Sequence, residues 1–341
     1  SGTARYYGCP AEEQLTGKAE MAKLGYFDGT DVSITWHPWD VSTVTDSTMT
    51  ALFSAEFHFT GRSAHAGTSP EAGHSALDAV ELMNVGVQFL REHMSDKARV
   101  HYATTDAGGR SPNVVQPRAS VLYMVRSNHV AEAVELQARV DKIAQGAALM
   151  TETTVEKKFI DGLADTVTNH ALERVLYRNF EALGVPSYTP DELAFADSLA
   201  GTYSGSDRAP GVGSQYDLDY AADAQARRAQ AGHAMNRFLL PLYQGDAFQP
   251  GSTDVGDVSW QCPTAQIHVA AWPNGCPGHS WQNVSCGRTD IGHKAALHAG
   301  EVLAAAAIDL LTDPALLEEA KTEFQRRTAA GYTCPIPADA V

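Results

Sequence analysis

Two adjacent carboxylates and a histidine near the start of the chain are residue types that suit metal-assisted hydrolysis. Glu12 and Glu13 close a Cys-Pro-Ala-Glu-Glu run, and His37 stands in a Trp-His-Pro run. One carboxylate can hold a cation while its neighbour takes a proton from metal-activated water, and an imidazole at a second strand end adds a ligand. Each run alone also suits a solvated turn or an ordinary loop, so support must come from further along the chain.

Further polar residues have two interpretations each. Asp254 and Asp257 lie in a polar turn, where they either cap the following segment or support a metal site from outside its ligand shell. Arg126 ends a predicted strand, where its guanidinium either pairs with a substrate carboxylate through two hydrogen bonds or is a surface group. Asn113 stands in a Ser-Pro-Asn turn, the usual place for a turn asparagine.

A domain inserted in the middle of the chain is predicted from residues 49–162. Strands are expected at 52–60, 99–105, 119–125 and 151–159, and apolar residues at helical spacing predict helices at 75–91 and 130–149. The order β-α-β-β-α-β is that of a ferredoxin-like unit, which can fold as a small domain within a larger one.

The remaining residues, 1–48 and 163–341, are expected to form one larger α/β domain with a mixed sheet. Helices are predicted at 17–24, 168–183, 190–200 and 291–311, and strands at 3–8, 32–36 and 265–271. The Gly-, Ser- and Asp-rich residues 201–232 are predicted to be a long surface loop. Because the chain opens directly on strand-like residues, the expectation is that an N-terminal part of this domain is missing.

Composition limits the classes of partner. The 341 residues carry 25 Lys and Arg against 41 Asp and Glu, a formal charge of -16, which disfavours nucleic acid and anionic membranes. No run of about 18 apolar residues is found, so no membrane span is expected. The five cysteines are scattered and odd in number, which favours free thiols in a reducing cytoplasm over a disulfide framework.

Five ordered blocks of sequence resemble the dinuclear metallopeptidase family of aminoacylases and glutamate carboxypeptidases. Within it, the chain is most similar to the B-type subunits of p-aminobenzoyl-glutamate hydrolases, over essentially its whole length. The blocks are Gly8–Glu13, Trp36–Pro38, Gly61–Ala66, Ser252–Trp260 and Gly278–Gln282. The resemblance implies a metallopeptidase-like domain with an inserted ferredoxin-like lid that also serves in dimerisation.

The resemblance also implies roles for single residues. Glu12 would be the general base and Glu13 a metal ligand, with His279 on the same metal and His37 on the other. His65, from the lid, would stabilise the oxyanion of the tetrahedral intermediate, and in relatives this histidine often serves the partner's site. Asn113 would bind the substrate backbone. Zinc or manganese suits such ligands, and two such ions are implied.

One departure from the family pattern concerns the metal shell. Members of this group use a Cys-Gly-His segment upstream of the Glu-Glu pair, and this chain has none; Cys286-Gly287 is followed by Arg288. The chain therefore lacks part of the ligand set for both metals.

Hydrolysis of the amide bond of an N-acyl amino acid is the expected function, with p-aminobenzoyl-glutamate as the favoured substrate. One alternative is another N-acyl amino acid or dipeptide amidohydrolase of the same fold. The other, suggested by the incomplete ligand set, is a catalytically inactive binding or regulatory subunit. A homodimer and a heterodimer with a related subunit remain equally open.

Overall fold

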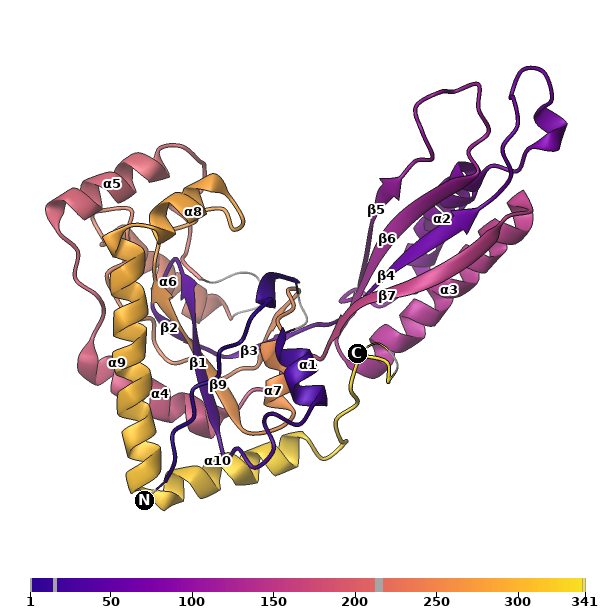
Figure 1. Ribbon diagram of the computed structural model, residues 1–341. Coiled ribbons are helices and arrows are strands. Elements are labelled where there is room, and N and C mark those ends of the chain that lie inside the picture. Colours follow the sequence, from indigo (N-terminus) through magenta and orange to yellow (C-terminus); the bar gives the residue numbers. More distant parts are fainter. Residues whose placement is uncertain (1, 15–16, 212–216, 339, 341) are drawn as a thin grey trace.

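The structure, a computed structural model, describes residues 2–14, 17–211, 217–338 and 340, which form two lobes (Figure 1). The lid projects away from a larger main lobe, and strands and chain segments near β3, α1 and the C-terminus lie where the two meet. The main lobe contains the described residues outside 51–163. The fold class expected from the sequence, a mixed α/β metallopeptidase-like domain with an inserted ferredoxin-like lid, is confirmed.

The lid is a four-stranded antiparallel sheet covered on one face by two helices. Its strands lie in the order β5-β6-β4-β7, and all neighbouring pairs are antiparallel. This arrangement is the ferredoxin-like one, because the first strand of the unit lies between the third and the fourth. The elements are β4 (Ala51–Thr60), η2 (Pro70–Ala72), α2 (Ala76–Leu90), η3 (Arg91–His93), β5 (Arg99–Asp106), β6 (Arg118–Ser127), α3 (Val130–Thr151) and β7 (Thr154–Leu163).

Alternation along β4 explains how the lid core forms. Phe57 and Phe59 are buried under the helices, whereas His58 between them lies on the other face and is partly exposed. Tyr123 of β6 packs edge-on against Phe57, and its hydroxyl donates to Asn84 Oδ1 at 2.6 Å. The apolar core is therefore built entirely from residues of one continuous segment.

The main lobe is assembled from both ends of the chain. A three-stranded sheet has β9 at its centre, parallel to β1 and antiparallel to β2, and a second sheet pairs β3 with β8. Its elements are η1 (Glu12–Gln14), α1 (Gly17–Lys23), β1 (Ser33–Trp39), β2 (Thr43–Thr45), β3 (Ser47–Met49), α4 (His170–Leu183), α5 (Pro190–Ala200), α6 (Leu218–Ala229), β8 (Ala247–Gln249), α7 (Val255–Ser259), β9 (Thr264–Ala270), α8 (Trp281–Gly287), α9 (Asp290–Thr312) and α10 (Pro314–Arg327).

The two faces of the three-stranded sheet have different partners. Ile267 and Val269 of β9 and Trp36 of β1 pack with α4 and α9. Side chains alternate along a strand, so His37 and His268 lie on the opposite face. This second face is the one available to a functional site.

Helix α9 is long and apolar enough, by length and composition alone, to cross a membrane, with a mean hydropathy of 1.4. Sequence reading found no such stretch. Its small residues Ala295, Ala299 and Ala306 are fully buried in the core that contains β9 and α4. Core helices commonly pass the same composition test, and these contacts make α9 a layer over the sheet.

Two of the predicted elements differ from the structure. Residues 3–8 form no strand, because no neighbouring strand pairs with them in the part of the chain described. The loop predicted at 201–232 contains α6, which Asp217 caps by accepting a hydrogen bond from the Tyr220 amide at 2.8 Å, while residues 212–216 lie outside the described part. Helix α6 buries only Ala224 among its own residues, so it has no apolar stripe to reveal it. The domain limits at 48/49 and 162/163 stay a prediction.

Candidate active site

Glu13 and His279, far apart in sequence, meet at the surface of the main lobe. His279 Nδ1 lies 3.6 Å from Glu13 Oε2, and both side chains are largely exposed, 82% and 75%. The backbone is left-handed at His279 (φ 54°) and at Ala11 (φ 62°), just before the two glutamates. Left-handed non-glycine residues cost energy and are enriched at functional sites. The local backbone therefore supports a site at this pair.

Glu12 is half-buried beside the turn that precedes α7. Thr253 Oγ1 donates to Glu12 Oε1 at 3.1 Å, which fixes one carboxylate oxygen and leaves the other free of hydrogen bonds among the described residues. Asp254, which follows Thr253 in the chain, is fully buried. Its carboxylate accepts hydrogen bonds from both the main-chain amide (2.9 Å) and the Nζ (2.7 Å) of Lys18. Glu12 and the start of α1 are thus both attached to the residues that directly precede α7.

His37 lies on the sheet face opposite α4 and α9. Its Nδ1 is 2.6 Å from the carbonyl oxygen of Pro38 and must donate to it, so in the neutral ring Nε2 is the lone-pair nitrogen. The ring lies 5.6 Å from that of His268, which stacks on Trp39 at 4.9 Å. Burial is the main cause that holds the pKa of His268 well below its usual range, and the positive charge that His37 carries when protonated acts in the same direction. His268, which the sequence left unassigned, therefore stays neutral beside His37.

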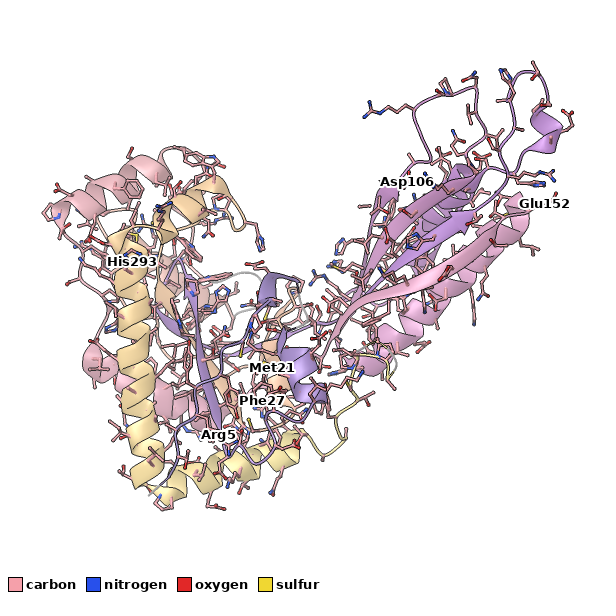
Figure 2. The ribbon with its side chains drawn as sticks, in the orientation of Figure 1. Arg5, Met21, Phe27, Asp106, Glu152 and His293 are labelled. Atoms are coloured by element: carbon pink, nitrogen blue, oxygen red, sulfur yellow. The ribbon has the colours of Figure 1, made fainter. Side chains whose placement is uncertain are left out.

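His65 and Asn113 lie together at the outer end of the lid. The amide of Ala66 donates to the Asn113 carbonyl at 2.9 Å, and His65 forms an isolated bridge with Val114. Figure 2 labels Asp106 and Glu152 at this end of the lid, away from Met21 and Phe27 in the main lobe. His65 Nδ1 accepts from the amides of Gly67 and Thr68, at 3.1 and 3.2 Å. The structure brings these two residues to each other and leaves them apart from the Glu13–His279 pair.

Arg126 lies in β6, at the end of the lid sheet that joins the main lobe. Its Nη1 donates to Ser252 Oγ at 2.8 Å, and its Nη2 lies 3.2 Å from Met124 Sδ. Partial burial lowers the pKa of its guanidinium. Among the described residues no carboxylate lies within ion-pair distance of Arg126, so the group is free to bind an anion.

Asp257 and Asp161 are buried carboxyls where the lid meets the main lobe. Asp257 accepts from the Ala164 amide at 3.0 Å and from the Tyr332 hydroxyl at 2.7 Å. Asp161 of β7 accepts from the Gly162 amide, and its Oδ2 has no partner within the described chain. Burial is the main cause that raises the pKa of each to about 7. Asp254 stands at the N-cap position of α7, but neither Asp254 nor Asp257 caps the helix through its side chain. The choice between structural support and a role outside the ligand shell of a metal site stays a prediction.

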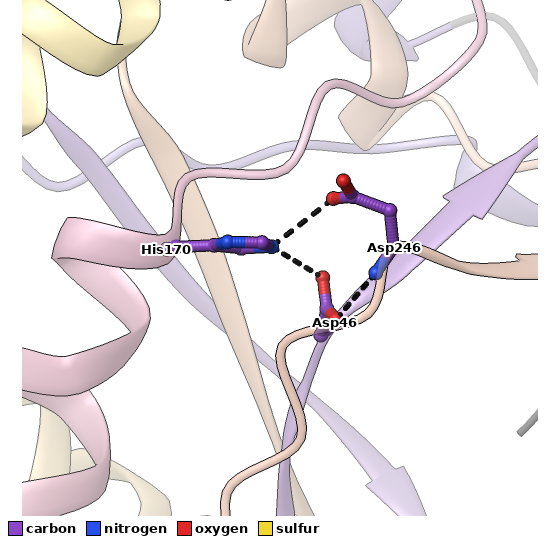
Figure 3. Close-up of side chains that lie close together, drawn as sticks. All are labelled: Asp46, His170 and Asp246. Atoms are coloured by element: carbon purple, nitrogen blue, oxygen red, sulfur yellow. Dashed lines mark hydrogen bonds and ion pairs between the residues drawn. The ribbon is translucent and has the colours of Figure 1, made fainter. Parts of the chain in front are cut away.

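A second group of ligand-type atoms, missed by sequence reading, lies where the start of α4 meets the residues directly before β3 and β8 (Figure 3). His170 Nε2 lies 3.2 Å from Asp46 Oδ1 and 3.1 Å from Asp246 Oδ1. The amides of Gly245 and Asp246 donate to Asp46 Oδ2, and Arg327 Nη1 donates to both oxygens of Asp246. Because protein donors already occupy these oxygens, the group fits an ion-pair network better than an open metal site.

The implied metal ions can be tested against the donor sets of the described residues. The side chains of Glu13 and His279 make no hydrogen bond there, and His37 presents a free Nε2 on a ring oriented by its Nδ1 contact, as metal-binding histidines do. The chemistry therefore fits divalent cations at these residues. The ligand atoms of Glu13, His279 and His37 do not all lie within 4.8 Å of one another. Among the described residues, only Asp46, His170 and Asp246 bring three such atoms this close together. The donor set seen is thus a partial one.

Sequence similarity identifies the family independently of the geometry. The chain is 42% identical over 343 residues to the B-type subunit of p-aminobenzoyl-glutamate hydrolase from Escherichia coli (strain K12), covering 98% of this chain and 70% of that protein. It is 23% identical over 319 residues to Xaa-Arg dipeptidase of Mus musculus, covering 93% of this chain and 61% of that protein.

Fold comparison agrees with this similarity. The aminobenzoyl-glutamate utilization protein from Klebsiella pneumoniae matches with a TM-score of 0.53 and 18% identity, over 88% of this chain and 60% of that chain. A model of the peptidase dimerisation domain matches residues 50–151, which fall within the lid. The chain belongs to the family of B-type p-aminobenzoyl-glutamate hydrolase subunits, a group of metallopeptidase-type amidohydrolases that carry a peptidase dimerisation domain.

Proposed function

We propose that the protein hydrolyses the amide bond of an N-acyl amino acid, with p-aminobenzoyl-glutamate as substrate and p-aminobenzoate and glutamate as products. The observation that carries the proposal is the pairing of Glu13 with His279 beside a half-buried Glu12 whose second oxygen is free. The similarity to a hydrolase subunit over nearly the whole chain supports it. A different N-acyl amino acid or a dipeptide is the alternative substrate class.

Glu13, His279 and His37 would hold divalent metal ions, zinc or manganese by the chemistry of the ligands. When bound, such ions polarise an amide carbonyl and lower the pKa of water. Glu12 takes a proton from water at its free oxygen and returns a proton to the leaving amine. Thr253 holds the other oxygen of Glu12 during both transfers.

Substrate recognition would come largely from the lid. Arg126 is a desolvated guanidinium with no ion-pair partner among the described residues, which suits a substrate carboxylate. His65 and Asn113 stand at the outer end of the lid. In our proposal they act in the active site of a second protomer, His65 on the oxyanion and Asn113 on the substrate backbone.

A dimer follows from that role of His65. The partner is a second copy of this chain or a related protein; the A-type subunit of the Escherichia coli hydrolase is 31% identical over 159 residues, 44% of this chain. Residues 50–151 match a dimerisation domain, which supports association through the lid. We also propose a cytoplasmic location, because all five cysteines are free thiols.

The test is a measurement of metal content and hydrolysis on the natural gene product. The substrate panel holds p-aminobenzoyl-glutamate, other N-acyl amino acids and dipeptides with a C-terminal arginine. Glu12→Gln should keep the metal and lower kcat by roughly 10²- to 10⁴-fold, the usual contribution of a general base. His279→Asn should lose metal, whereas His293→Asn, an exposed histidine of α9, should change neither property.

An inactive binding or regulatory subunit is the second candidate, favoured by the partial donor set of the described residues. Parent protein that binds metal but cleaves nothing in the panel, alone or with the related subunit, would support that candidate. Protein that takes up no metal and cleaves nothing would contradict the hydrolase assignment altogether.

A further inference from the structure

Three consecutive residues before α7 each contact a different functional element. Ser252 binds Arg126 of the lid, Thr253 binds Glu12, and Asp254 binds Lys18 at the start of α1. The partners of Thr253 and Asp254 lie 241 and 236 residues away in sequence. The segment 252–254 thus links the lid, the general base and the helix that follows the base.

Hydrogen-bond direction at Thr253 is fixed by chemistry. A carboxylate only accepts, so Thr253 Oγ1 must donate to Glu12 Oε1 at 3.1 Å. The same Oγ1 accepts from the Val255 amide at 3.4 Å. The hydroxyl is therefore held by the main chain of α7 and points its hydrogen at the base. Such a donor sets which oxygen of Glu12 faces the substrate.

The position of the base is also restrained through Lys18 and Gly17. The Lys18 side chain is 14% exposed and that of Asp254 is fully buried, so this ion pair is largely removed from water. A Cβ on Gly17 would lie 1.8 Å from the Pro10 carbonyl oxygen, so only glycine allows α1 to approach the turn that leads to Glu12. Helix α1, the Pro10 turn and residue 254 consequently form one packed unit.

Ser252 connects this unit to the lid. Thr50 Oγ1 donates to the Gly251 carbonyl at 2.9 Å, so Ser252 Oγ donates to Thr50 Oγ1 at 2.8 Å and accepts from Arg126 Nη1 at 2.8 Å. Each hydroxyl hydrogen is used once. A shift of Arg126 towards a bound anion changes the hydrogen bonds of Ser252, which is directly bonded along the chain to Thr253.

We propose that Thr253 is a positioning residue for Glu12 and that the segment 252–254 couples the binding of a substrate carboxylate at Arg126 to the orientation of the base. The inference rests on the proposed hydrolase function. It adds Thr253 as a residue that acts through Glu12. It also adds a route by which a ligand bound at Arg126 of the lid affects proton transfer at Glu12.

The test compares Thr253→Val, which keeps shape but removes the donor, with Thr253→Ser, which restores it, in the natural gene product. Thr253→Val should lower kcat roughly 10- to 100-fold, as misplaced catalytic groups do, while KM stays nearly unchanged. Thr253→Ser should restore kcat. Thr264→Val is the matched control, because Thr264 is a buried threonine at the start of β9 whose hydroxyl donates to the Cys262 carbonyl at 2.9 Å and not to Glu12.

Coupling is tested by Ser252→Ala, alone and combined with Thr253→Val. Ser252→Ala should raise KM and lower kcat, and the double variant should lose less than the product of the single losses. Multiplicative losses would contradict the coupling. An unchanged kcat in Thr253→Val, when the unsubstituted protein is active, would overturn the positioning role.

Hydrogen exchange gives a readout that needs no activity. Amides of residues 11–14 should exchange faster in Thr253→Val than in Thr253→Ser or the Thr264→Val control. If the parent cleaves no substrate, the hydrolase function has failed, and this exchange measurement still decides the inference. Equal exchange in all variants would overturn it.

Discussion

The lid and the main lobe differ in how far apart in sequence the residues that hold them together lie. The lid core is an apolar cluster drawn from one continuous segment, with Phe57, Met83 and Val121 fully or almost fully buried. The main lobe also has an apolar core, and in addition buried polar contacts join it across long sequence separations, such as Lys18 with Asp254. Asn236 likewise donates to the Asp40 carbonyl, 196 residues away. We expect the lid to be sensitive to cavities and the main lobe to charge and pH.

Tryptophan gives a way to observe the two lobes separately. All five tryptophans lie outside residues 51–163, at Trp36, Trp39, Trp260, Trp272 and Trp281. Tryptophan fluorescence therefore reports unfolding of the main lobe, whereas far-ultraviolet circular dichroism reports both lobes.

The largest effect is expected from Phe57→Ala in the lid. The side chain is 1% exposed and packs against Tyr123, so its removal leaves a cavity and should cost about 4 kcal/mol of lid stability. Denaturant titration should show the circular dichroism transition moving to lower denaturant while the tryptophan transition stays in place. Movement of both transitions together would show that the lobes unfold as one unit.

This comparison also explains which parts of the fold the sequence predicts. The alternation in β4 and the helical spacing in α2 and α3 predict the lid, because each element packs on neighbours in the same segment. The main-lobe sheet pairs Ser33 with Thr264, and no local pattern specifies such a partner. The strand expected at residues 3–8 has the right composition, but no strand pairs with it in the described part of the chain.

The candidate site was predictable where residue type alone carries the chemistry. Family resemblance singled out Glu13 and His279, and the structure brings them together. Thr253 was missed because a threonine in a polar turn has the composition of any turn. Asp161 was missed because its pKa depends on burial, which the strand sequence does not encode. His170 was missed because its two aspartates come from residues 46 and 246, far away in sequence.

Lys18→Met should give the largest effect in the main lobe. It leaves the buried Asp254 carboxylate without its cation, and removing one partner of a buried pair should cost about 3 kcal/mol. The tryptophan transition should move to lower denaturant, whereas the part of the circular dichroism transition that the lid contributes should stay in place. Adding Asp254→Asn should recover part of the loss, since no charge then remains buried. A double variant as unstable as the sum of the two single variants would contradict the pairing.

Asp161→Asn should reveal the pH dependence of the region between the lobes. Burial raises the folded-state pKa of Asp161 from 3.8 to about 7, with Asp254, Asp257 and Glu20 adding negative charge nearby. The folded state then binds more protons than the unfolded state between about pH 4 and about pH 7, so wild-type stability falls as pH rises through that window. Asn stays neutral throughout. The gain in the free energy of unfolding from Asp161→Asn should therefore be about 2 kcal/mol larger at about pH 8 than at about pH 5.

The measurement is the free energy of unfolding of both proteins at the two pH values, from the far-ultraviolet circular dichroism signal, which reports both lobes. The control is Ser54→Ala, which changes a buried, uncharged polar residue of β4. Its free energy of unfolding should differ from that of the wild type by the same amount at both pH values. A pH-independent effect of Asp161→Asn would contradict burial as the cause of the raised pKa.

The smallest effect is expected from Asp309→Asn, which removes an exposed ion pair of the main lobe. Asp309 accepts from Asn179 at 2.8 Å and from Arg178 at 2.6 Å, which lowers its pKa, so its stabilising contribution is present above about pH 4 and is lost as pH falls further. The Arg178 side chain is 58% exposed, and such pairs contribute only about 0.5 kcal/mol. The loss should shrink at high salt, whereas that of Lys18→Met should not, because burial shields the Lys18–Asp254 pair from ions. Equal salt sensitivity of the two variants would remove the distinction between buried and exposed cross-links in the main lobe.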